Sequence, residues 1–473
     1  MQNIIGRSEE KEILQSLLTS SKSELLAIYG RRRTGKTHLI REFFKEAGLF
    51  LEFTGMLRGR ASEQLWNFTQ VLNKTFCPHP QIKPPKNWNQ AFHILVDLLS
   101  QVPQEKKVII FFDELPWLAT PRSDLLRSLE YLWNRHLSQR PNIIVVLCGS
   151  AAAWMIKKIV NNRGGLHGRL TKKIHLQPFS LYETEVFLRA KNIILDRKQL
   201  VELYMVTGGI AKYLEQAEPG LSSAQIIQQL CFTQHGFLRS EFQPLLASLF
   251  DDSELHIAII KALAKTRKGL TLSKISEATK KVTSGRFSGA LKDLVASGFV
   301  QFIPFYGRKK RDGLYRLVDE YCLFYLNWIH GKDPLIRFER SPEFFSWAGY
   351  AFENICIKHV HRIIKSLDLP IVAKSIWYWD KKPTDLPGAQ IDLIIDRTDR
   401  CINLLEIKFC EGLYCIKNDY SEHLQQRKAI FAEATKSRKT IFNTLITPFG
   451  AAKNPPYLSS IDQQLTLNAL FEH

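Results

Sequence analysis

Apolar and polar positions form two kinds of pattern in the first third of the chain. Runs of consecutive apolar residues predict buried strands at Leu25–Tyr29, Leu49–Thr54, Val108–Asp113 and Asn142–Gly149. Amphipathic stretches with helical spacing lie between them, for example Thr37–Glu46 and Ala91–Ser100. Strands that alternate with helices predict a parallel sheet with helices on both faces, so we expect an α/β fold.

The pattern then becomes helical, with no strong strand from about residue 178 to 250. Two helices are predicted there, Tyr182–Ala190 and Arg197–Met205, before a turn at Thr207-Gly208-Gly209. Farther on, three helical patterns precede a hairpin formed by Phe299–Phe305 and Gly313–Leu317. Three helices followed by a β-ribbon predict a winged helix-turn-helix.

The last part has a linker-like segment, His330–Ser341, and then one long predicted helix, Pro342–Leu367. The clearest strands after it are Gln390–Asp396 and Asn403–Phe409, so this part is mixed α/β. Four domains are therefore predicted: an α/β core, a helical domain, a winged helix and a mixed α/β domain, over residues 1–177, 178–250, 251–335 and 336–473.

Composition adds a strong basic bias, because 65 Lys and Arg residues against 46 Asp and Glu give a net charge of +19. Such an excess favours a polyanionic partner, above all nucleic acid, although a basic surface can also serve solubility. The eight cysteines form no CxxC pair, which argues against structural zinc. We expect no signal peptide and no membrane span, and therefore a cytoplasmic protein.

The segment Gly30-Arg31-Arg32-Arg33-Thr34-Gly35-Lys36-Thr37 matches the phosphate-binding pattern GxxxxGK[ST]. It follows a predicted strand and opens a predicted helix, which is the context that the pattern requires. Backbone N–H groups and the helix N-terminus would hold the phosphates of ATP. Lys36 would reach the β- and γ-phosphates, and the Thr37 hydroxyl would bind Mg²⁺.

A second acidic motif, Asp113-Glu114, ends the apolar strand Val108–Asp113. It fits a Walker B motif, in which Asp113 holds Mg²⁺ and Glu114 polarises the attacking water. Ser150, at the end of another buried strand, is a candidate sensor of the γ-phosphate or a cap of the next helix. Arg169 is a candidate for charge at the transition state, in cis or toward a neighbouring subunit, or a structural residue.

These motifs recur in an order that resembles the archaeal-type AAA+ ATPase family, which is close to the STAND signalling ATPases. The resemblance rests on five segments: Ile5-Gly6-Arg7-Ser8-Glu9-Glu10, Tyr29–Thr37, Phe112-Asp113-Glu114, Cys148-Gly149-Ser150 and Thr207-Gly208-Gly209-Ile210. It implies that Gly6 and Arg7 lie near the adenine and that a helical lid closes on the nucleotide. Two positions depart from the family: Ser8 replaces a common Glu, and Ala211 replaces the proline of the lid motif.

The predicted winged helix has polar residues opposite the apolar face of its third helix, namely Ser284, Arg286, Ser288 and Lys292. The tip of its wing carries four consecutive basic residues, Arg308-Lys309-Lys310-Arg311. A recognition helix in the major groove with a basic wing on the phosphates fits this pattern. Winged helices in this ATPase class also serve as packing or autoinhibitory modules, and the pattern leaves that alternative open.

Two strands of the last domain carry charges within apolar runs. Asp392 and Glu406 could bind Mg²⁺ or Mn²⁺ together with the carbonyl of Ile407, and Lys408 could orient water or neutralise a phosphate. This Asp and Glu-x-Lys pattern resembles the PD-(D/E)XK nuclease fold. That resemblance implies a further acid on a preceding helix, for which Glu353 is in place. The alternative is an inert remnant or an ordinary surface pair.

Two hypotheses therefore stand. In the first, the chain is an ATP-dependent enzyme that acts on nucleic acid, with DNA favoured, and that could cleave it with a divalent metal. Alternatively, it is a STAND-type switch whose C-terminal domain binds a partner protein without cutting. A homo-oligomer is compatible with both hypotheses.

Overall fold

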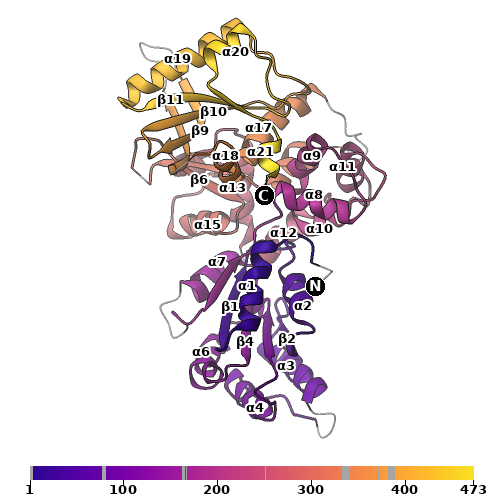
Figure 1. Ribbon diagram of the computed structural model, residues 1–473. Coiled ribbons are helices and arrows are strands. Elements are labelled where there is room, and N and C mark those ends of the chain that lie inside the picture. Colours follow the sequence, from indigo (N-terminus) through magenta and orange to yellow (C-terminus); the bar gives the residue numbers. More distant parts are fainter. Residues whose placement is uncertain are drawn as a thin grey trace. The chain divides into compact units, whose positions relative to one another are not determined.

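The computed structural model divides into two compact units, Met1–Pro178 and Phe179–His473, which we describe separately (Figure 1). The residues that the structure describes are 4–76, 81–161, 166, 168–250, 252–309, 311–332, 341–369, 372–381 and 389–472.

The first unit is built on a five-stranded parallel sheet with the strand order β2-β3-β4-β1-β5. Its strands are β1 (Glu24–Tyr29), β2 (Leu49–Thr54), β3 (Val108–Asp113), β4 (Ile143–Gly149) and β5 (Lys172–His175). The four predicted strands are confirmed to within one residue at each end. The fifth lies in the extended stretch after Arg169, where its alternating pattern, Lys-Lys-Ile-His, is too short and polar to predict a strand.

Helices cover both faces of this sheet, as the alternating pattern predicts (Figure 1). One face packs against α1 (Ser8–Thr19) and α2 (Lys36–Phe44). The other packs against α3 (Ala61–Phe76), α4 (Trp88–Ser100) and α6 (Leu125–Arg135). Strand β3 divides its side chains between the two cores, because successive residues of a strand point to opposite faces.

The strand order also decides where polar residues meet. Strand β4 lies between β1 and β3, with Gly149 paired with Tyr29 and Leu147 paired with Phe112. The carboxyl ends of these three strands therefore lie side by side at one edge of the sheet. The residues that follow β1, β3 and β4 are the two predicted motifs and Ser150.

The second unit starts with a helical part. It comprises α8 (Leu181–Ala190), α9 (Arg197–Thr207), α10 (Ala211–Leu214), α11 (Ser223–Phe232) and α12 (Phe242–Leu249). Side-chain caps fix where its helices begin: Ser180 and Glu183 form a capping box at α8, and Asp196 caps α9. We call residues 179–250 the helical part; like the sequence pattern, it contains no strand among its residues, all of which the structure describes.

Three helices and a hairpin come next, as the periodicity predicts. They are α13 (Ser253–Ala264), α14 (Leu272–Thr279), α15 (Gly285–Ala296), β6 (Val300–Pro304) and β7 (Gly313–Leu317). The hairpin is antiparallel, and an isolated antiparallel bridge joins Leu270 to Tyr315 of β7. The short helix α16 (Glu320–Phe324) ends this segment.

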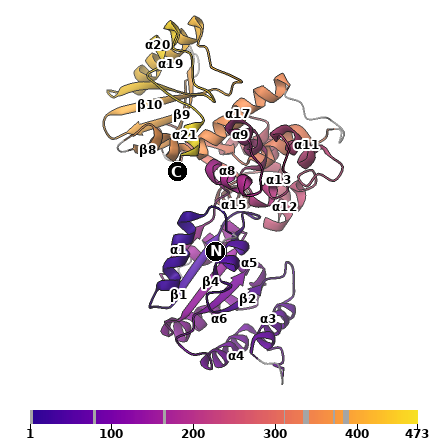
Figure 2. The same cartoon turned by 45° about the vertical axis from the view of Figure 1, so that its right-hand side comes forward.

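The C-terminal lobe, residues 341–472, contains a five-stranded mixed sheet with the order β12-β11-β10-β9-β8 (Figure 2). Its strands are β8 (Val372–Lys381), β9 (Ala389–Arg397), β10 (Cys401–Ile407), β11 (Thr440–Ile446) and β12 (Gln463–Leu465). The first three are antiparallel and the last three parallel. Helix α17 (Pro342–Lys358) covers one face, and α19 (Asn418–Thr435) covers the other.

The prediction of one long helix over Pro342–Leu367 is wrong. The helix ends at Lys358, and a second helix, α18 (Val360–Ser366), begins after His359. The buried His359 ring bonds the carbonyl of Ile355 through Nδ1 (2.8 Å) and accepts a hydrogen bond from the Leu181 N–H at Nε2 (3.2 Å). The residue at the break thus contacts Leu181, which lies 178 positions away in the sequence. No Pro or Gly at the break predicts it from the local sequence.

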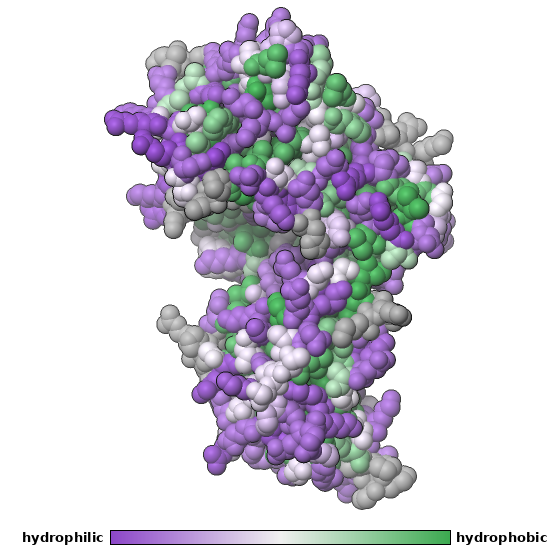
Figure 3. Space-filling model, viewed as in Figure 1, coloured by the Kyte–Doolittle hydropathy of each residue, from purple (hydrophilic) through white to green (hydrophobic). Residues whose placement is uncertain are grey.

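The surface and the cysteines agree with an ordinary folded protein. Figure 3 shows hydrophilic side chains over most of the face that it presents. Among the described residues, no helix is both long and apolar enough to cross a bilayer. Cys148, Cys231, Cys322 and Cys356 are buried and free, as expected for core thiols.

Candidate nucleotide-binding site

The loop between β1 and α2 needs its two glycines. At Gly30, where φ is 146°, a Cβ atom would lie 2.2 Å from the carbonyl oxygen of Leu176. Gly35 caps α2 with φ 92°, and nothing lies within 4 Å of the position of its Cβ. The first glycine allows the loop to pack on its own sheet, and the second leaves the backbone open for a ligand to approach.

Lys36 is buried at the centre of this loop. Its ammonium donates to the carbonyl oxygens of Gly30 (3.0 Å) and Arg31 (2.6 Å). Burial lowers the pKa of Lys36, and the nearby carboxylates of Asp113 and Glu114 work in the opposite direction. The amine therefore lies where the loop, the strand end and the acidic motif meet.

Thr37 and Asp113 are brought together across 76 residues of sequence. The Thr37 hydroxyl lies 2.9 and 3.1 Å from the two carboxylate oxygens of Asp113, which is itself buried. Hydroxyl and carboxylate oxygens are hard ligands of the kind that Mg²⁺ prefers. Their adjacency beside the loop fits the predicted Mg²⁺ site, and these two residues are the ones that would hold the ion.

Glu114 is fixed by Ser150. Both the backbone N–H (3.0 Å) and the hydroxyl (2.8 Å) of Ser150 donate to one carboxylate oxygen of Glu114. The backbone of Glu114 is left-handed, with φ 47°, which is uncommon for a residue with a side chain. The hydroxyl of Ser150 does not cap the following short helix, α7 (Ala152–Met155), whose capping position is Ala151.

The N-terminal motif is joined to the same loop. Arg7 is buried, its guanidinium donates to the carbonyl of Thr34 (3.3 Å), and it pairs with Glu10 at 3.6 Å. Gly6 and Arg7 both have left-handed φ values, 67° and 59°. This sharp turn places the motif against the loop, next to the region where the resemblance puts the adenine.

The other predicted loop residues are held in different ways. The Thr34 hydroxyl donates to the Arg31 carbonyl (2.9 Å), which stabilises the loop internally. Arg31 is buried, Arg33 has φ 69°, and Arg32 lies 5.5 Å from the ring centroid of Trp117. Trp117 follows the acidic motif in α5 (Leu115–Leu118), so a cation–π contact links the two motifs.

Arg169 does not join the site. The residues just before β5 lie at the amino edge of the sheet, since the Thr171 N–H bonds the carbonyl of Leu25 at the start of β1. The phosphate-binding loop follows the other end of β1, about 16 Å of strand away. This placement contradicts a role of Arg169 in cis at this nucleotide; a role toward a neighbouring subunit stays a prediction.

The sequence reasoning gave no role to Cys148, which lies on β4 next to the acidic motif. Its thiol is buried and bonds Asp113, and burial, with the Asp113 charge second, raises its pKa well above the ordinary value. Tyr29 and His175, at the ends of β1 and β5, stack at 4.8 Å. Tyr29 directly precedes the loop in the sequence, whereas only the strand order places His175 beside it.

The glycine pair of the predicted lid motif lies in the second unit and has a packing role there. At Gly208 a Cβ would lie 2.6 Å from a carboxylate oxygen of Glu320, and at Gly209 only 2.1 Å from the carbonyl of Phe179. Ala211, which departs from the family proline, is the first residue of α10. Proline and alanine both suit that position, so the departure leaves the helix intact.

The acidic cluster of the C-terminal lobe is already neutralised by protein cations. The carboxylate of Glu406 pairs with Arg427 and with Lys408 (2.9 Å) and accepts a hydrogen bond from the Tyr420 hydroxyl. Burial alone would raise the pKa of Glu406, but Arg427 and Lys408 outweigh it and lower the pKa to about 2. A divalent metal would have to compete with both cations.

The structure describes the two other predicted acids only in part. Glu353 pairs with Arg316 of β7 at 2.9 Å. The pairing of β9 with β10 extends to Leu393 and Leu405, the residues next to Asp392 and Glu406, and the Asp392 side chain lies outside the described residues. Among the described side chains, no group of three Cys, His, Asp or Glu residues could hold a metal. The described part of the cluster therefore fits a metal poorly.

The basic residues of the three-helix segment are mostly exposed. Lys292 is exposed on α15, Arg286 pairs with Asp252, and the Ser284 side chain caps α15. At the tip of the hairpin, Arg308 lies 4.7 Å from the ring centroid of Phe305, and Lys310 is outside the described residues. Ser288 is half-buried on α15.

Comparison with known proteins supports the first of these sites. Residues 5–217 match the model of an ATPase domain found predominantly in Archaea. An uncharacterized protein of Methanocaldococcus jannaschii is 25% identical over 417 residues, which are 86% of this chain and 87% of that protein.

Among solved structures, the Walker-type ATPase of Pyrococcus abyssi is 20% identical, with a TM-score of 0.49 over 69% of this chain and 97% of that one. The ORC2 protein of Aeropyrum pernix is 14% identical, with a TM-score of 0.44 over 76% of this chain and 98% of that one. The domain match and the loop described above together support a P-loop ATPase domain over residues 5–217.

Proposed function

We propose that this chain hydrolyses ATP at the carboxyl edge of the first unit's sheet and uses the nucleotide state to control its contact with nucleic acid. The observation that carries the first part is the convergence of two polar pairs at that edge: Thr37 with Asp113, and Glu114 with Ser150. The pair of Thr37 and Asp113 suits binding of a metal ion, and the pair of Glu114 and Ser150 suits positioning of a water molecule. Phosphoryl transfer to water requires both the ion and a positioned water.

Each residue has a separate task in this proposal. Thr37 and Asp113 would hold Mg²⁺, which would neutralise charge on the phosphates. Lys36 and the N–H groups of the loop would bind the phosphate oxygens. Glu114 orients and polarises the water. Ser150 is a positioning residue, because it acts through the Glu114 carboxylate and holds that group in one orientation.

The contact with nucleic acid is assigned to the three-helix segment, which we interpret as a winged helix. Exposed basic side chains gather on α14, on α15 and on the turn between them: Lys274, Lys280, Lys281, Arg286 and Lys292. Val282, in the same turn, is 85% exposed. A basic face around a projecting apolar side chain suits a DNA groove, where phosphates and thymine methyl groups lie close together.

The rest of the hairpin faces the C-terminal lobe. Tyr306 packs on Phe431 at 5.4 Å and donates to Asp396 (3.4 Å). Arg316 is buried between Glu353 and the ring of Tyr350. These contacts support separate roles for the two parts of the segment. Helix α15 and the turn before it would contact DNA, while the hairpin packs on the C-terminal lobe.

Salt-dependent DNA binding tests this assignment. The variant Lys281→Ala/Lys292→Ala should bind double-stranded DNA at least roughly tenfold more weakly, and its salt slope should fall by about 2, because two phosphate contacts are lost. The matched control, Lys22→Ala/Lys86→Ala, removes two exposed lysines of the first unit. Equal affinities of wild type and the first variant would rule out this face.

A second candidate function is a nucleotide-driven switch whose C-terminal lobe binds a partner without cutting. The ion pairs of Glu406 with Arg427 and Lys408 favour it, because they compete with the metal that a nuclease needs. A nuclease assay with Mg²⁺ or Mn²⁺, with and without ATP, separates the two candidates. Cleavage by wild type that is lost in Asp392→Ala would establish the nuclease, and intact DNA and RNA would leave the switch.

A further inference from the structure

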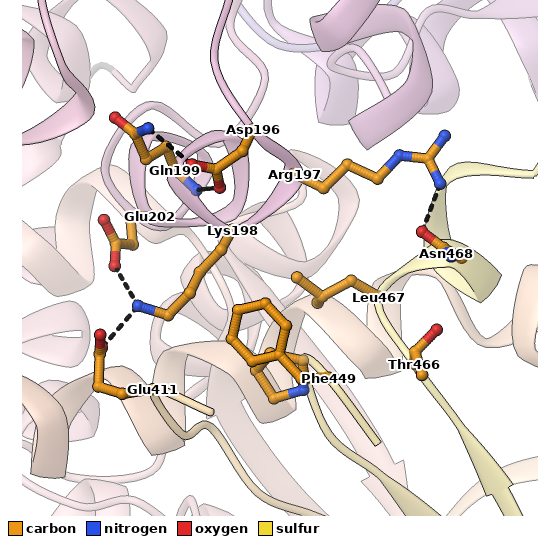
Figure 4. A pocket seen from close by; sticks show the side chains of 11 residues that line it. Asp196, Arg197, Lys198, Gln199, Glu202, Glu411, Phe449, Thr466, Leu467 and Asn468 are labelled. Atoms are coloured by element: carbon orange, nitrogen blue, oxygen red, sulfur yellow. Dashed lines mark hydrogen bonds and ion pairs between the residues drawn. The ribbon is translucent and has the colours of Figure 1, made fainter. Parts of the chain in front are cut away.

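A cleft of about 620 Å³ separates the helical part of the second unit from the C-terminal lobe (Figure 4). One wall is the first turn of α9. The other wall consists of residues that follow the three parallel strands of the lobe: Glu411 after β10, Phe449 after β11, and the segment 466–468 after β12. Loops at the carboxyl ends of parallel strands thus face one helix N-terminus across an open space.

Lys198 makes the principal polar contact across this cleft. Its ammonium lies 3.0 Å from Glu202 on its own helix and 2.5 Å from Glu411 of the lobe. Figure 4 shows both carboxylates pointing at this one nitrogen. The ammonium also lies 5.3 Å from the ring centroid of Phe409, so the lobe supplies a charge and an aromatic ring to the same amine.

Arg197 makes the second contact, on the other side of Phe449. Its guanidinium donates to the side chain of Asn468 (2.6 Å) and lies 4.8 Å from the ring centroid of Phe471. Both partners belong to α21 (Asn468–Phe471), the last helix of the chain. Two consecutive residues of α9 therefore contact two separate segments of the lobe, the loop after β10 and helix α21.

Apolar contacts anchor the same helix. Leu467, Leu470 and Phe471 are each at most 3% exposed and belong to the core cluster that also contains residues of α8 and α9. The Ser366 hydroxyl of α18 donates to the Ala469 carbonyl (3.3 Å). The end of the chain is thus docked on the helical part by an apolar anchor and a polar clamp.

Of the contacts that form this clamp, which are those of Lys198 with Glu411 and of Arg197 with Asn468, the ion pair of Lys198 with Glu411 is suited to release. Glu202 is 4% exposed and also accepts a hydrogen bond from Ser223, whereas Glu411 is 53% exposed. When Glu411 leaves, Lys198 keeps its buried partner, so no ammonium is left buried and unpaired. The Glu411 carboxylate is already 53% exposed, which lowers the cost of breaking this bond.

We infer that α9 couples the helical part to the C-terminal lobe through this releasable clamp, which keeps the segment Thr466–Phe471 docked. The helix spans about 16 Å, and its other end is the close-packed pair Gly208–Gly209. Because a helix moves as a rigid element, a displacement of Gly208–Gly209 would also displace Lys198 at the other end of α9. The inference does not require that the chain hydrolyse ATP.

Hydrogen–deuterium exchange of the full chain, without nucleotide, tests the clamp. In Glu411→Ala, the amides of residues 463–471 should exchange roughly two- to fivefold faster, since an ion pair with one exposed partner is lost. The matched control is Glu215→Ala, because Glu215 is 54% exposed and pairs with Lys212 at 2.7 Å. It should leave residues 463–471 unchanged.

Two further readouts keep the result interpretable. Raising the salt concentration should speed exchange of the same segment in wild type and have less effect in Glu411→Ala, because only wild type has the pair to screen. Circular dichroism of both variants should match wild type. Unchanged exchange in a folded Glu411→Ala, or an equal change in Glu215→Ala, would overturn the clamp.

Discussion

At the scale of single residues, the carboxyl edge of the first unit's sheet depends on side chains that hold one another. Glu114 has a left-handed backbone and a carboxylate bound twice by Ser150. A carboxylate that must polarise a water gains from being fixed, because reorientation during the reaction would add to the barrier. Ser150 therefore belongs to the account of hydrolysis although it need not touch ATP.

Substitution of Ser150 tests this positioning role. Ser150→Ala removes one of the two donors to Glu114, and we expect kcat for ATP hydrolysis to fall about tenfold while KM stays within about twofold. Ser150→Thr keeps the hydroxyl and should restore most of the rate. A change in KM alone, or no recovery with threonine, would show that Ser150 serves binding or packing.

How far the sequence predicts this site depends on whether a residue's partner is near in sequence. The loop Gly30–Thr37 and the acidic motif were predicted because each has a local pattern after an apolar strand. The bond between Glu114 and Ser150, and the thiol of Cys148 beside Asp113, depend on β4 lying between β1 and β3. For Arg169 the sequence left open a role in cis, a role toward a neighbouring subunit and a structural role, since only the sheet shows that it lies at the opposite edge.

At the scale of elements, periodicity predicts most helices and strands, and it fails where tertiary contacts decide. The second of the three predicted helical patterns forms α14 (Leu272–Thr279), because its apolar face and its cap at Thr271 agree. The long helix after residue 341 instead breaks at His359, whose ring is held by Ile355 and Leu181. The bond to Leu181 also supplies an acceptor at the start of α8, so two helices depend on one neutral imidazole.

This imidazole predicts a pH dependence of stability. Burial lowers the pKa of His359 to about 3, whereas an unfolded histidine titrates near 6.5. Between these values the unfolded state binds more protons, so stability should fall as the pH decreases from about 6.5 toward 3, by up to about 5 kcal/mol.

Thermal or denaturant unfolding between pH 7.5 and 4.5 measures this effect. His359→Ala should be less stable than wild type at pH 7.5, and the difference should shrink as the pH falls. His330→Ala, which changes an exposed histidine, should follow the wild-type pH profile. A constant difference between wild type and His359→Ala would mean that the ring does not titrate as described.

At the scale of the whole molecule, the proposed contact with nucleic acid rests on the net charge of +19 and on the exposed lysines around α15. The sequence predicted the basic bias, but it could not show that the hairpin packs on the C-terminal lobe through Tyr306 and Arg316. Nor could it show that Arg427 neutralises Glu406, because that arginine lies 21 residues away on α19. The sequence pattern thus did not reveal that two protein cations already pair with Glu406.

The most direct measurement is steady-state ATP hydrolysis with Mg²⁺ by wild type, Lys36→Ala and Lys45→Ala. Lys45 follows the same helix, α2, and pairs with Glu42 at 2.7 Å, so its loss controls for removal of a lysine at that helix. The account predicts hydrolysis by wild type and Lys45→Ala, and a rate lower by at least roughly 100-fold in Lys36→Ala. Equal rates in all three proteins, or no hydrolysis by folded wild type with or without DNA, would contradict it.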